Sequence, residues 1–250
     1  VAPGAPVGAV RGRRAMPVLI GTCGWQYRHW RGLLYPPGLP QRAWLARYAE
    51  RFAALEVDSS FYRLPSRDAV ARWAAALPDD MVVTAKASRY LTHVRRLRDP
   101  AEPVERLLDR LAPLGPRLAV VLLQLPPTMP RDDHALAGAL DAFAGRVRVA
   151  VEPRHDTWFV PEVHDLLAAR GAALCLADRG GPLTPLWNTA GWGYLRLHGG
   201  GADPPGCYRP DELDAWAGRL AGLHGPDAEV LVLLNNDGSG CALRDAQPEP

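Results

Sequence analysis

Lysine and asparagine are nearly absent from this 250-residue sequence. The 29 basic residues include one lysine, Lys86, so the other 28 are arginines. Only three asparagines occur, and two of them, Asn235 and Asn236, are adjacent. A lone lysine among so many arginines indicates a position where a compact ammonium or a neutralisable amine matters, since arginine supplies neither. We therefore treat Lys86 and the two asparagines as candidate functional residues.

Cysteines and long apolar runs are also scarce. The four cysteines, at positions 23, 175, 207 and 241, form no C-x-x-C pair, which disfavours a zinc ribbon or a thioredoxin-type site. We expect free thiols in a reducing cytoplasm. No apolar run approaches the roughly 18–20 residues that span a bilayer, so we expect a cytoplasmic protein without a membrane partner. The net charge of +2 disfavours a dedicated polyanion binder but is compatible with a local basic patch.

The first fifteen residues differ from the rest of the chain. Residues 1–15 combine small apolar residues with arginines and predict a disordered leader. The arginines follow the apolar residues, which is the reverse of a signal peptide. Val1 fits a GTG start codon or a start assigned too far upstream, and Met16 directly precedes the first predicted strand. We expect residues 16–250 to form one domain.

Short apolar segments alternate with amphipathic ones along the remainder. Eight segments predict strands: Val18–Thr22, Leu55–Asp58, Met81–Lys86, Leu118–Gln124, Val147–Glu152, Ala172–Asp178, Gly193–His198 and Glu229–Asn235. Six predict helices: Gln41–Phe52, Arg67–Leu77, Pro103–Leu111, Asp132–Phe143, Pro161–Arg170 and Pro210–Leu223. Strands that alternate with helices pair in parallel through right-handed crossovers. The length and the pattern predict an α/β protein with a single (β/α)8 TIM-like barrel.

Two helices of an ideal barrel are missing from this pattern. Residues 180–191 are rich in proline and glycine, so a loop should replace the sixth helix. The chain ends soon after the eighth predicted strand, so the last helix should be abridged.

A polar residue closes each predicted strand. These residues are Thr22, Asp58, Lys86, Gln124, Glu152, Asp178, His198 and Asn235. Barrel enzymes place their active sites at the C-terminal ends of the strands, which we call the mouth. Side chains alternate along a strand, so Glu56 shares a face with Asp58, and Arg196 with His198. The alternative is a lattice of structural ion pairs, such as Glu152 with Arg196 and Asp178 with Lys86, in a scaffold or binding module.

The loops after the first, second, third and fifth strands are basic and aromatic. Arginine forks suit phosphate or carboxylate groups, and aromatic faces suit bases or sugar rings. We expect a small anionic, ring-bearing ligand, bound in part by Arg28. The other predicted substrate-binding residues are Trp25, Tyr27, Asp58, Tyr62, Arg89, Gln124, Arg154, His155, Trp158, Arg196, Asn235 and Asn236. The alternative for each aromatic residue is that it packs its loop against the barrel.

Several motifs carry a family resemblance. They are GTCGW-x-Y-x-x-W-x-G-x-x-YP at 21–36, EVDSSFYRLP at 56–65, KASRYLTH at 86–93, QLPP at 124–127, VEPRHDTW at 151–158, CLAD at 175–178, YLRLHG at 194–199 and NND at 235–237. Together they resemble the domain-of-unknown-function family 72 (DUF72), also called YecE-like. The resemblance implies a (β/α)8 barrel similar to those of sugar isomerases and endonuclease IV, and it assigns no reaction. Cys23 stands where the family usually has serine, Asp58 where it has asparagine, and Pro153 where it has an aromatic residue.

We expect an enzyme that acts on a small anionic or polyhydroxylated substrate by acid/base or hydrolytic chemistry. Its predicted catalytic residues are Lys86, Glu152, Asp178 and His198. Lys86 would be a point charge against a substrate oxyanion or against Asp58 and Glu152. Alternatively, it would be a neutral amine that acts as a base or forms a Schiff base. The sequence requires no cofactor, although Glu152, Asp178, His198 and Asp237 could hold a divalent metal ion. The alternative is a nucleic-acid-binding barrel, related to endonuclease IV-like folds, without chemistry of its own.

Overall fold

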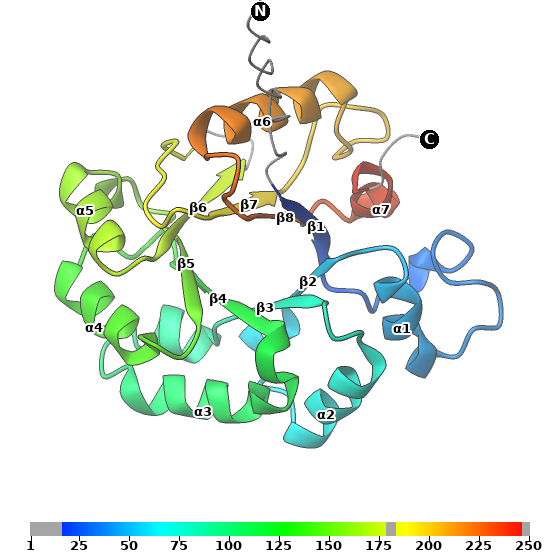
Figure 1. Ribbon diagram of the computed structural model, residues 1–250, viewed down its shortest axis with the longest axis horizontal. Helices are drawn as coiled ribbons and strands as arrows, with labels where there is room; N and C mark the ends of the chain where they lie inside the picture. Colours follow the sequence, from blue (N-terminus) through cyan, green and yellow to red (C-terminus); the bar gives the residue numbers. More distant parts are fainter. Residues whose placement is uncertain (1–16, 179–183, 247–250) are drawn as a thin grey trace, which may run out of the picture.

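The computed structural model describes residues 17–178 and 184–246. Eight parallel strands close into a barrel in sequence order, and β8 pairs with β1 (Figure 1). The strands are β1 (Val18–Cys23), β2 (Ala54–Val57), β3 (Val82–Lys86), β4 (Leu118–Gln124), β5 (Arg148–Glu152), β6 (Ala173–Asp178), β7 (Gly193–Leu197) and β8 (Val230–Leu234). Each predicted strand is present, and no end differs by more than one residue.

Helices surround the barrel on the outside (Figure 1). They are α1 (Trp44–Ala49), α2 (Arg67–Ala76), α3 (Ala101–Leu111), α4 (Asp133–Phe143), α5 (Pro161–Ala169), α6 (Pro210–Leu223) and α7 (Cys241–Asp245). The predicted helix at 41–52 is shorter than expected, because a 3-10 turn at Gln41–Ala43 precedes α1 and the chain turns after Ala49. No described helix is long and apolar enough to cross a membrane.

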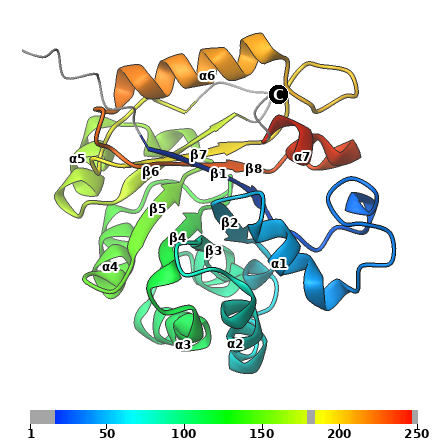
Figure 2. The ribbon, with the colours of Figure 1, turned by 45° about the vertical axis from the view of Figure 1, so that its right-hand side comes forward.

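The two incomplete units agree with the sequence pattern. Residues 184–192, before β7, contain no helix, while residues 179–183 lie outside the described part. The last helix, α7, has five residues (red in Figure 2). The predicted leader at residues 1–15 lies outside the described residues.

Side chains inside the barrel form a core separate from the one between strands and helices. Val120, Leu122, Cys175, Leu231 and Leu233 belong to this inner core and are fully buried. Because alternate residues of a strand face the same way, the residues two positions further along the same strands also point inward. The polar residues that follow these positions, among them Lys86, Gln124, Glu152 and Arg196, therefore point into the mouth.

The expectation of four free thiols is wrong. Cys207, in the loop after β7, and Cys241, at the start of α7, form a disulfide. The two residues are 34 positions apart in the sequence, and only barrel closure brings their Cα atoms within 4.8 Å. Cys23 and Cys175 are free and buried. Burial raises the pKa of both thiols, so neither supplies a thiolate nucleophile at neutral pH.

Candidate active site

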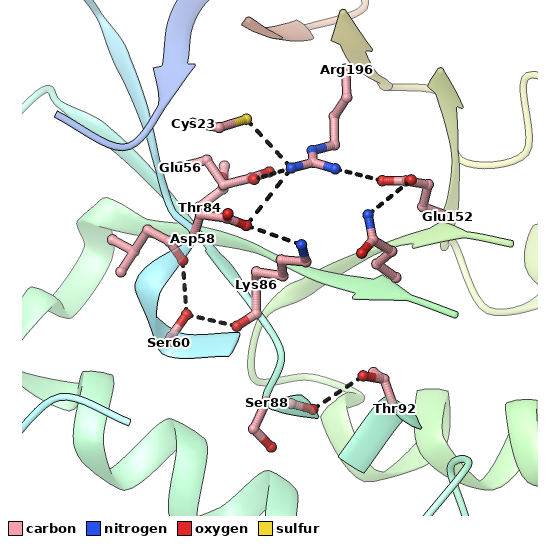
Figure 3. A network of polar contacts seen from close by, with 12 residues as sticks. Cys23, Glu56, Asp58, Ser60, Thr84, Lys86, Ser88, Thr92, Glu152 and Arg196 are labelled. Atoms are coloured by element: carbon pink, nitrogen blue, oxygen red, sulfur yellow. Dashed lines mark hydrogen bonds and ion pairs between the residues drawn. The ribbon is translucent and has the colours of Figure 1, made fainter. Parts of the chain in front are cut away.

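Arg196 occupies the centre of the mouth and is completely buried. Its Nη2 donates to Glu56 Oε1 and its Nη1 to Glu152 Oε2, each at 2.7 Å (Figure 3). Both glutamates are also buried. Charges without solvent need close partners of opposite sign, and a guanidinium fork can satisfy two carboxylates at once. The pairing of Glu152 with Arg196 considered as an alternative above is therefore present, and Arg196 is enclosed by protein rather than offered to a substrate.

Glu56 connects this pair to the barrel interior. Its Oε2 accepts a hydrogen bond of 2.7 Å from the Tyr194 hydroxyl, which lies 2.9 Å from Thr84 Oγ1. Burial and the neighbouring carboxylate raise the pKa of Tyr194, so the phenol remains a donor. The sequence pattern placed Glu56 on the same face as Asp58, yet it was missing from the predicted site. Glu56 lies two positions before Asp58, so the alternation of side chains along the strand predicts that both face the mouth.

Within the described part of the chain, Gln124, Arg154 and Arg196 donate to Glu152. Gln124 Nε2 and Arg154 Nε each lie 3.0 Å from Glu152 Oε1, while Arg196 binds Oε2. Register explains the first contact, because Gln124 and Glu152 are partners in the pairing of β4 with β5. Arg154 is partly exposed, so its guanidinium extends from the buried network to the solvent side of the mouth. Glu152 is thereby fixed in one orientation.

Lys86 points into the mouth, as predicted, and its ammonium lies 3.2 Å from Asp58 Oδ1. Of the carboxylates suggested for Lys86, Asp58 is therefore its ion-pair partner, and Asp178 is not. The ammonium also lies 4.5 Å from the centre of the Phe61 ring, a cation–π distance. The Ser60 hydroxyl lies 2.7 Å from the carbonyl oxygen of Lys86, which ties the loop after β2 to the end of β3 (Figure 3). Lys86 is 7% exposed, and Asp58 is more accessible.

The side of the mouth next to β3 and β5 is electropositive. His93 packs edge-on against Phe61, with 4.9 Å between ring centres. Burial lowers the pKa of His93, and the charges of Arg89, Lys86 and Arg154 lower it further. His93 is therefore a neutral imidazole at pH 7, surrounded by three cations. It was absent from the predicted site, although its position in the basic loop after β3 was visible.

The opposite side, next to β1 and β8, carries an imidazole–carboxylate pair. Asp237 Oδ2 lies 2.8 Å from His29 Nε2, and Asp237 Oδ1 accepts a 2.7 Å hydrogen bond from the Trp30 indole. Burial raises the pKa of Asp237, which the contacts with Trp30 and His29 partly offset. Tyr27 packs on Trp30 and donates to the carbonyl oxygen of Cys23. Tyr27 is therefore near the mouth, as predicted.

Asp178 does not face the mouth, which corrects the expectation that every strand end converges there. Along β6 the inward residue is Cys175, so Asp178 points outward with Leu174 and Leu176. Its carboxylate accepts hydrogen bonds from the His198 backbone at 2.7 Å and from the Tyr208 hydroxyl at 2.6 Å. Asp178 thus joins the loop after β7 to β6 and is left out of the candidate site.

Most of the aromatic side chains that were predicted to bind substrate pack the loops against the barrel instead. Trp158 is completely buried and donates to the Met129 carbonyl oxygen, and Trp25 is buried against Trp73. Tyr62 is the exception, since 80% of it is exposed. His155 caps the short 3-10 turn Asp156–Trp158, because its ring nitrogen accepts from the backbone N–H of Thr157. Burial of such bulky rings at the bases of the loops stabilises the fold. The two tryptophans therefore pack the loops and are not available to stack on a ligand.

The two adjacent asparagines have different environments. Asn236 is buried, and its amide donates to the Gly206 carbonyl oxygen at 2.9 Å and to Asp245 at 2.7 Å. The Asn236 amide therefore donates to residues 30 and 9 positions away in the sequence, and its contact with substrate stays a prediction. Asn235 is half-buried on the inward-facing register of β8. His198 follows Arg196 on the inward face of β7, with its Nε2 3.4 Å from Arg196 Nη1.

The four predicted metal ligands do not gather at one point. Glu152 is in the central network, Asp178 is on the outer face of β6, and Asp237 contacts His29. Among residues 17–178 and 184–246, no group of three or more histidine, cysteine or carboxylate side chains is arranged to hold a metal ion.

Comparisons with known proteins agree with the fold. Residues 19–248 match the family described as "Protein of unknown function DUF72". The UPF0759 protein YunF of Bacillus subtilis (strain 168) is 26% identical over 90% of both chains. The UPF0759 protein YecE of Escherichia coli (strain K12) is 32% identical over 62% of this chain, and the match spans about half the length of YecE (54%).

Solved structures show the same barrel. A DUF72 family protein from Thermotoga maritima MSB8 superposes with a TM-score of 0.79 at 25% identity, over 92% of this chain and 96% of that one. D-psicose 3-epimerase from Clostridium cellulolyticum H10 has a TM-score of 0.53 at 14% identity, over 86% of this chain and 84% of that one, a likeness of fold alone. The chain belongs to the DUF72 family of proteins of unknown function.

Proposed function

We propose that this protein is an enzyme that binds a small anionic or polyhydroxylated substrate in its mouth and moves a proton by acid/base catalysis. The observation that carries the proposal is the buried charge array of Glu56, Arg196 and Glu152. Replacing such an array with apolar residues is often neutral or stabilising, so folding alone gives little reason for it. A rigid set of charges at the strand ends does, however, stabilise charge that develops in a transition state.

The substrate would bind on the electropositive side. Lys86, Arg89 and Arg154 all lie close enough to His93 to lower its pKa, so their fields overlap there. An anionic group that entered this space would be attracted by all three cations. Arg154 is anchored by Glu152, and Lys86 by Asp58, so both would be oriented before the substrate arrives.

His93 is our proposed proton acceptor. A neutral imidazole at pH 7 can take a proton from a substrate C–H or O–H group, which leaves the electron pair on the substrate. Lys86 would stabilise the resulting oxyanion through its ammonium, and the proton on His93 would return to the substrate in the second half of the reaction. His93 and Lys86 flank the same Phe61 ring, which supports their action on one bound molecule. This assignment replaces Asp178 with His93 in the predicted catalytic set.

Deuterium exchange provides the test. Sugar phosphates, sugar acids and unphosphorylated sugars are first screened by thermal shift, where binding at a hundredfold excess over Kd stabilises the fold by about 2.7 kcal/mol. Those that bind are incubated with protein in D2O and analysed by proton NMR. We expect deuterium incorporation with the native protein and with Arg72→Gln, an exposed control on α2. Loss of exchange in His93→Gln with binding retained supports the proposal. Unchanged exchange in that variant, or no stabilisation by any compound, would contradict it.

A further inference from the structure

A second site lies outside the mouth, in a groove of about 1100 Å3 between α2, α3 and the loops after β2 and β3. Its walls include four arginines, Arg63, Arg89, Arg106 and Arg110, and no carboxylate. In Figure 1, α2 and α3 are neighbours on the outside of the barrel next to β3. The groove starts beside the mouth, because Phe61 lines it and also contacts Lys86.

The arginines of the groove are largely unneutralised. Arg106 pairs with Glu102 on the exposed surface of α3, at 3.3 Å. Arg63, Arg89 and Arg110 form no ion pair with any carboxylate in residues 17–178 and 184–246. Elsewhere in this part of the chain many surface arginines have an acidic partner, for example Arg170 with Asp141. A net charge of only +2 makes this concentration of positive charge a local feature of the groove.

Aromatic side chains accompany the arginines. Tyr62 is 80% exposed and Tyr90 is 42% exposed, and both line the groove. Tyr62 and Phe61 pack at right angles with 5.0 Å between their ring centres, and the Tyr62 ring is largely open to solvent. Large aromatic residues exposed in a groove are typical of binding surfaces, since folding would otherwise bury them. Unpaired bases stack on such rings regardless of sequence.

We propose that this groove binds a short segment of single-stranded nucleic acid, with phosphates on the arginines and bases on Tyr62 and Tyr90. Positive charge alone would suit any polyanion, but the exposed tyrosines favour a ligand that has a flat ring for each charge. Stacking requires unpaired bases, which a duplex does not offer. The groove shares Arg89 with the proposed substrate site, but the inference does not depend on the catalytic function, because Arg63, Arg110, Tyr62 and Tyr90 have no part in that mechanism.

Fluorescence anisotropy with a labelled ten-nucleotide single strand of mixed sequence tests the salt dependence. With four phosphate contacts the slope of log K against log salt is about −2.8, so affinity falls about fiftyfold between 50 and 200 mM salt. Arg63→Gln/Arg110→Gln removes two contacts, which halves the slope and reduces that loss to about sevenfold. The matched control is Arg51→Gln/Arg72→Gln, which changes the net charge equally at exposed residues outside the groove. Equal slopes for the two double variants would overturn the proposal.

Two further measurements separate a nucleic-acid strand from other anions. Tyr62→Ala should weaken binding about five- to 150-fold, as expected for the loss of one stacked base, while Tyr62→Phe retains it. A nucleoside monophosphate or a polyglutamate peptide that displaced the strand at equal concentration would overturn the assignment. Absence of binding at 50 mM salt would overturn it as well. The Arg63→Gln/Arg110→Gln variant should keep the His93 titration of the native protein. A failure of the nucleic-acid proposal can therefore be distinguished from a failure of the catalytic proposal.

Discussion

Arg196 and Glu152 meet across the centre of the barrel with 2.7 Å between Nη1 and Oε2, although they are 44 positions apart in the sequence. Both are buried, and Glu56 occupies the other branch of the guanidinium. The charges of this array are enclosed by protein, so a ligand can be contacted only by the other charged side chains of the mouth. Arg154 is bound to this array through Glu152 and is partly exposed, whereas Lys86, paired with Asp58, is nearly buried.

Removing the central guanidinium should destabilise the protein strongly. In Arg196→Met the carboxylates of Glu56 and Glu152 lose their shared buried cation, and such a loss costs about 3–5 kcal/mol. The control, Arg170→Met, removes an exposed ion pair with Asp141 and should cost about 0–1 kcal/mol. Urea unfolding followed by circular dichroism measures both. Equal costs in the two variants would show that the buried array contributes no more than a surface pair.

His93 should titrate below the ordinary range of histidine. Its pKa is lowered by burial and then by the charges of Arg89, Lys86 and Arg154, so the neutral form dominates at pH 7 and protonation occurs below pH 6.5. Arg89→Gln removes one cation and should raise the pKa toward 6.5. Imidazole chemical shifts followed by NMR against pH measure the change directly. The exposed control Arg72→Gln should leave the His93 titration where it is, and an identical titration in Arg89→Gln would contradict our account of the mouth.

The barrel itself was predictable from the sequence because strand and helix periodicities are local. Each strand end was located within one residue, and the loop before β7 followed from proline and glycine. Inward and outward directions were harder, because one residue of difference reverses them. Lys86 and Glu152 end their strands on the inward register, whereas Asp178 ends β6 on the outward one.

Partners across the barrel were only partly predictable: the sequence offered the pair of Glu152 with Arg196, which is present, but not most other contacts. The sequence suggested Asp58, Glu152 and Asp178 as partners of Lys86 without deciding between them, and barrel closure places Asp58 there. The same closure joins Cys207 to Cys241, which no spacing indicates. His93 was visible as part of a basic loop, yet its role depends on a π-helical turn at Tyr90–Val94 that positions the ring against Phe61. Such contacts depend on tertiary structure and leave no periodic signal.

The adjacent asparagines should respond differently to substitution. Asn236→Ala loses hydrogen bonds to Gly206 and Asp245 and leaves their acceptors buried, so we expect about 1–3 kcal/mol of destabilisation. Asn235→Ala should change stability little, because the Asn235 side chain makes no hydrogen bond to another described residue. Thermal unfolding of both variants checks the difference. For Asn235→Asp, which removes the amide donors, we expect weaker stabilisation by any compound that binds in the mouth. The reverse order of stabilities would invalidate the distinction.

Lys86 provides the most direct test of the proposed chemistry. Its ammonium fits between Asp58 and the Phe61 ring in a nearly closed site, where the longer and planar guanidinium of arginine would need different partners. Lys86→Arg keeps the charge and should fold, but we expect loss of the ligand-induced thermal shift and of deuterium exchange. Lys86→Met should also lose both, and by removing a cation it should raise the pKa of His93, which Lys86→Arg should not.

Asp58→Asn, which leaves Lys86 without its carboxylate partner, should retain ligand binding because the three cations remain. Borohydride treatment with carbonyl compounds that bind tests the Schiff-base role, and we expect no trapped adduct because the Lys86 ammonium is paired with Asp58. A Lys86→Arg variant with native binding and exchange would show that this lysine is only a structural cation.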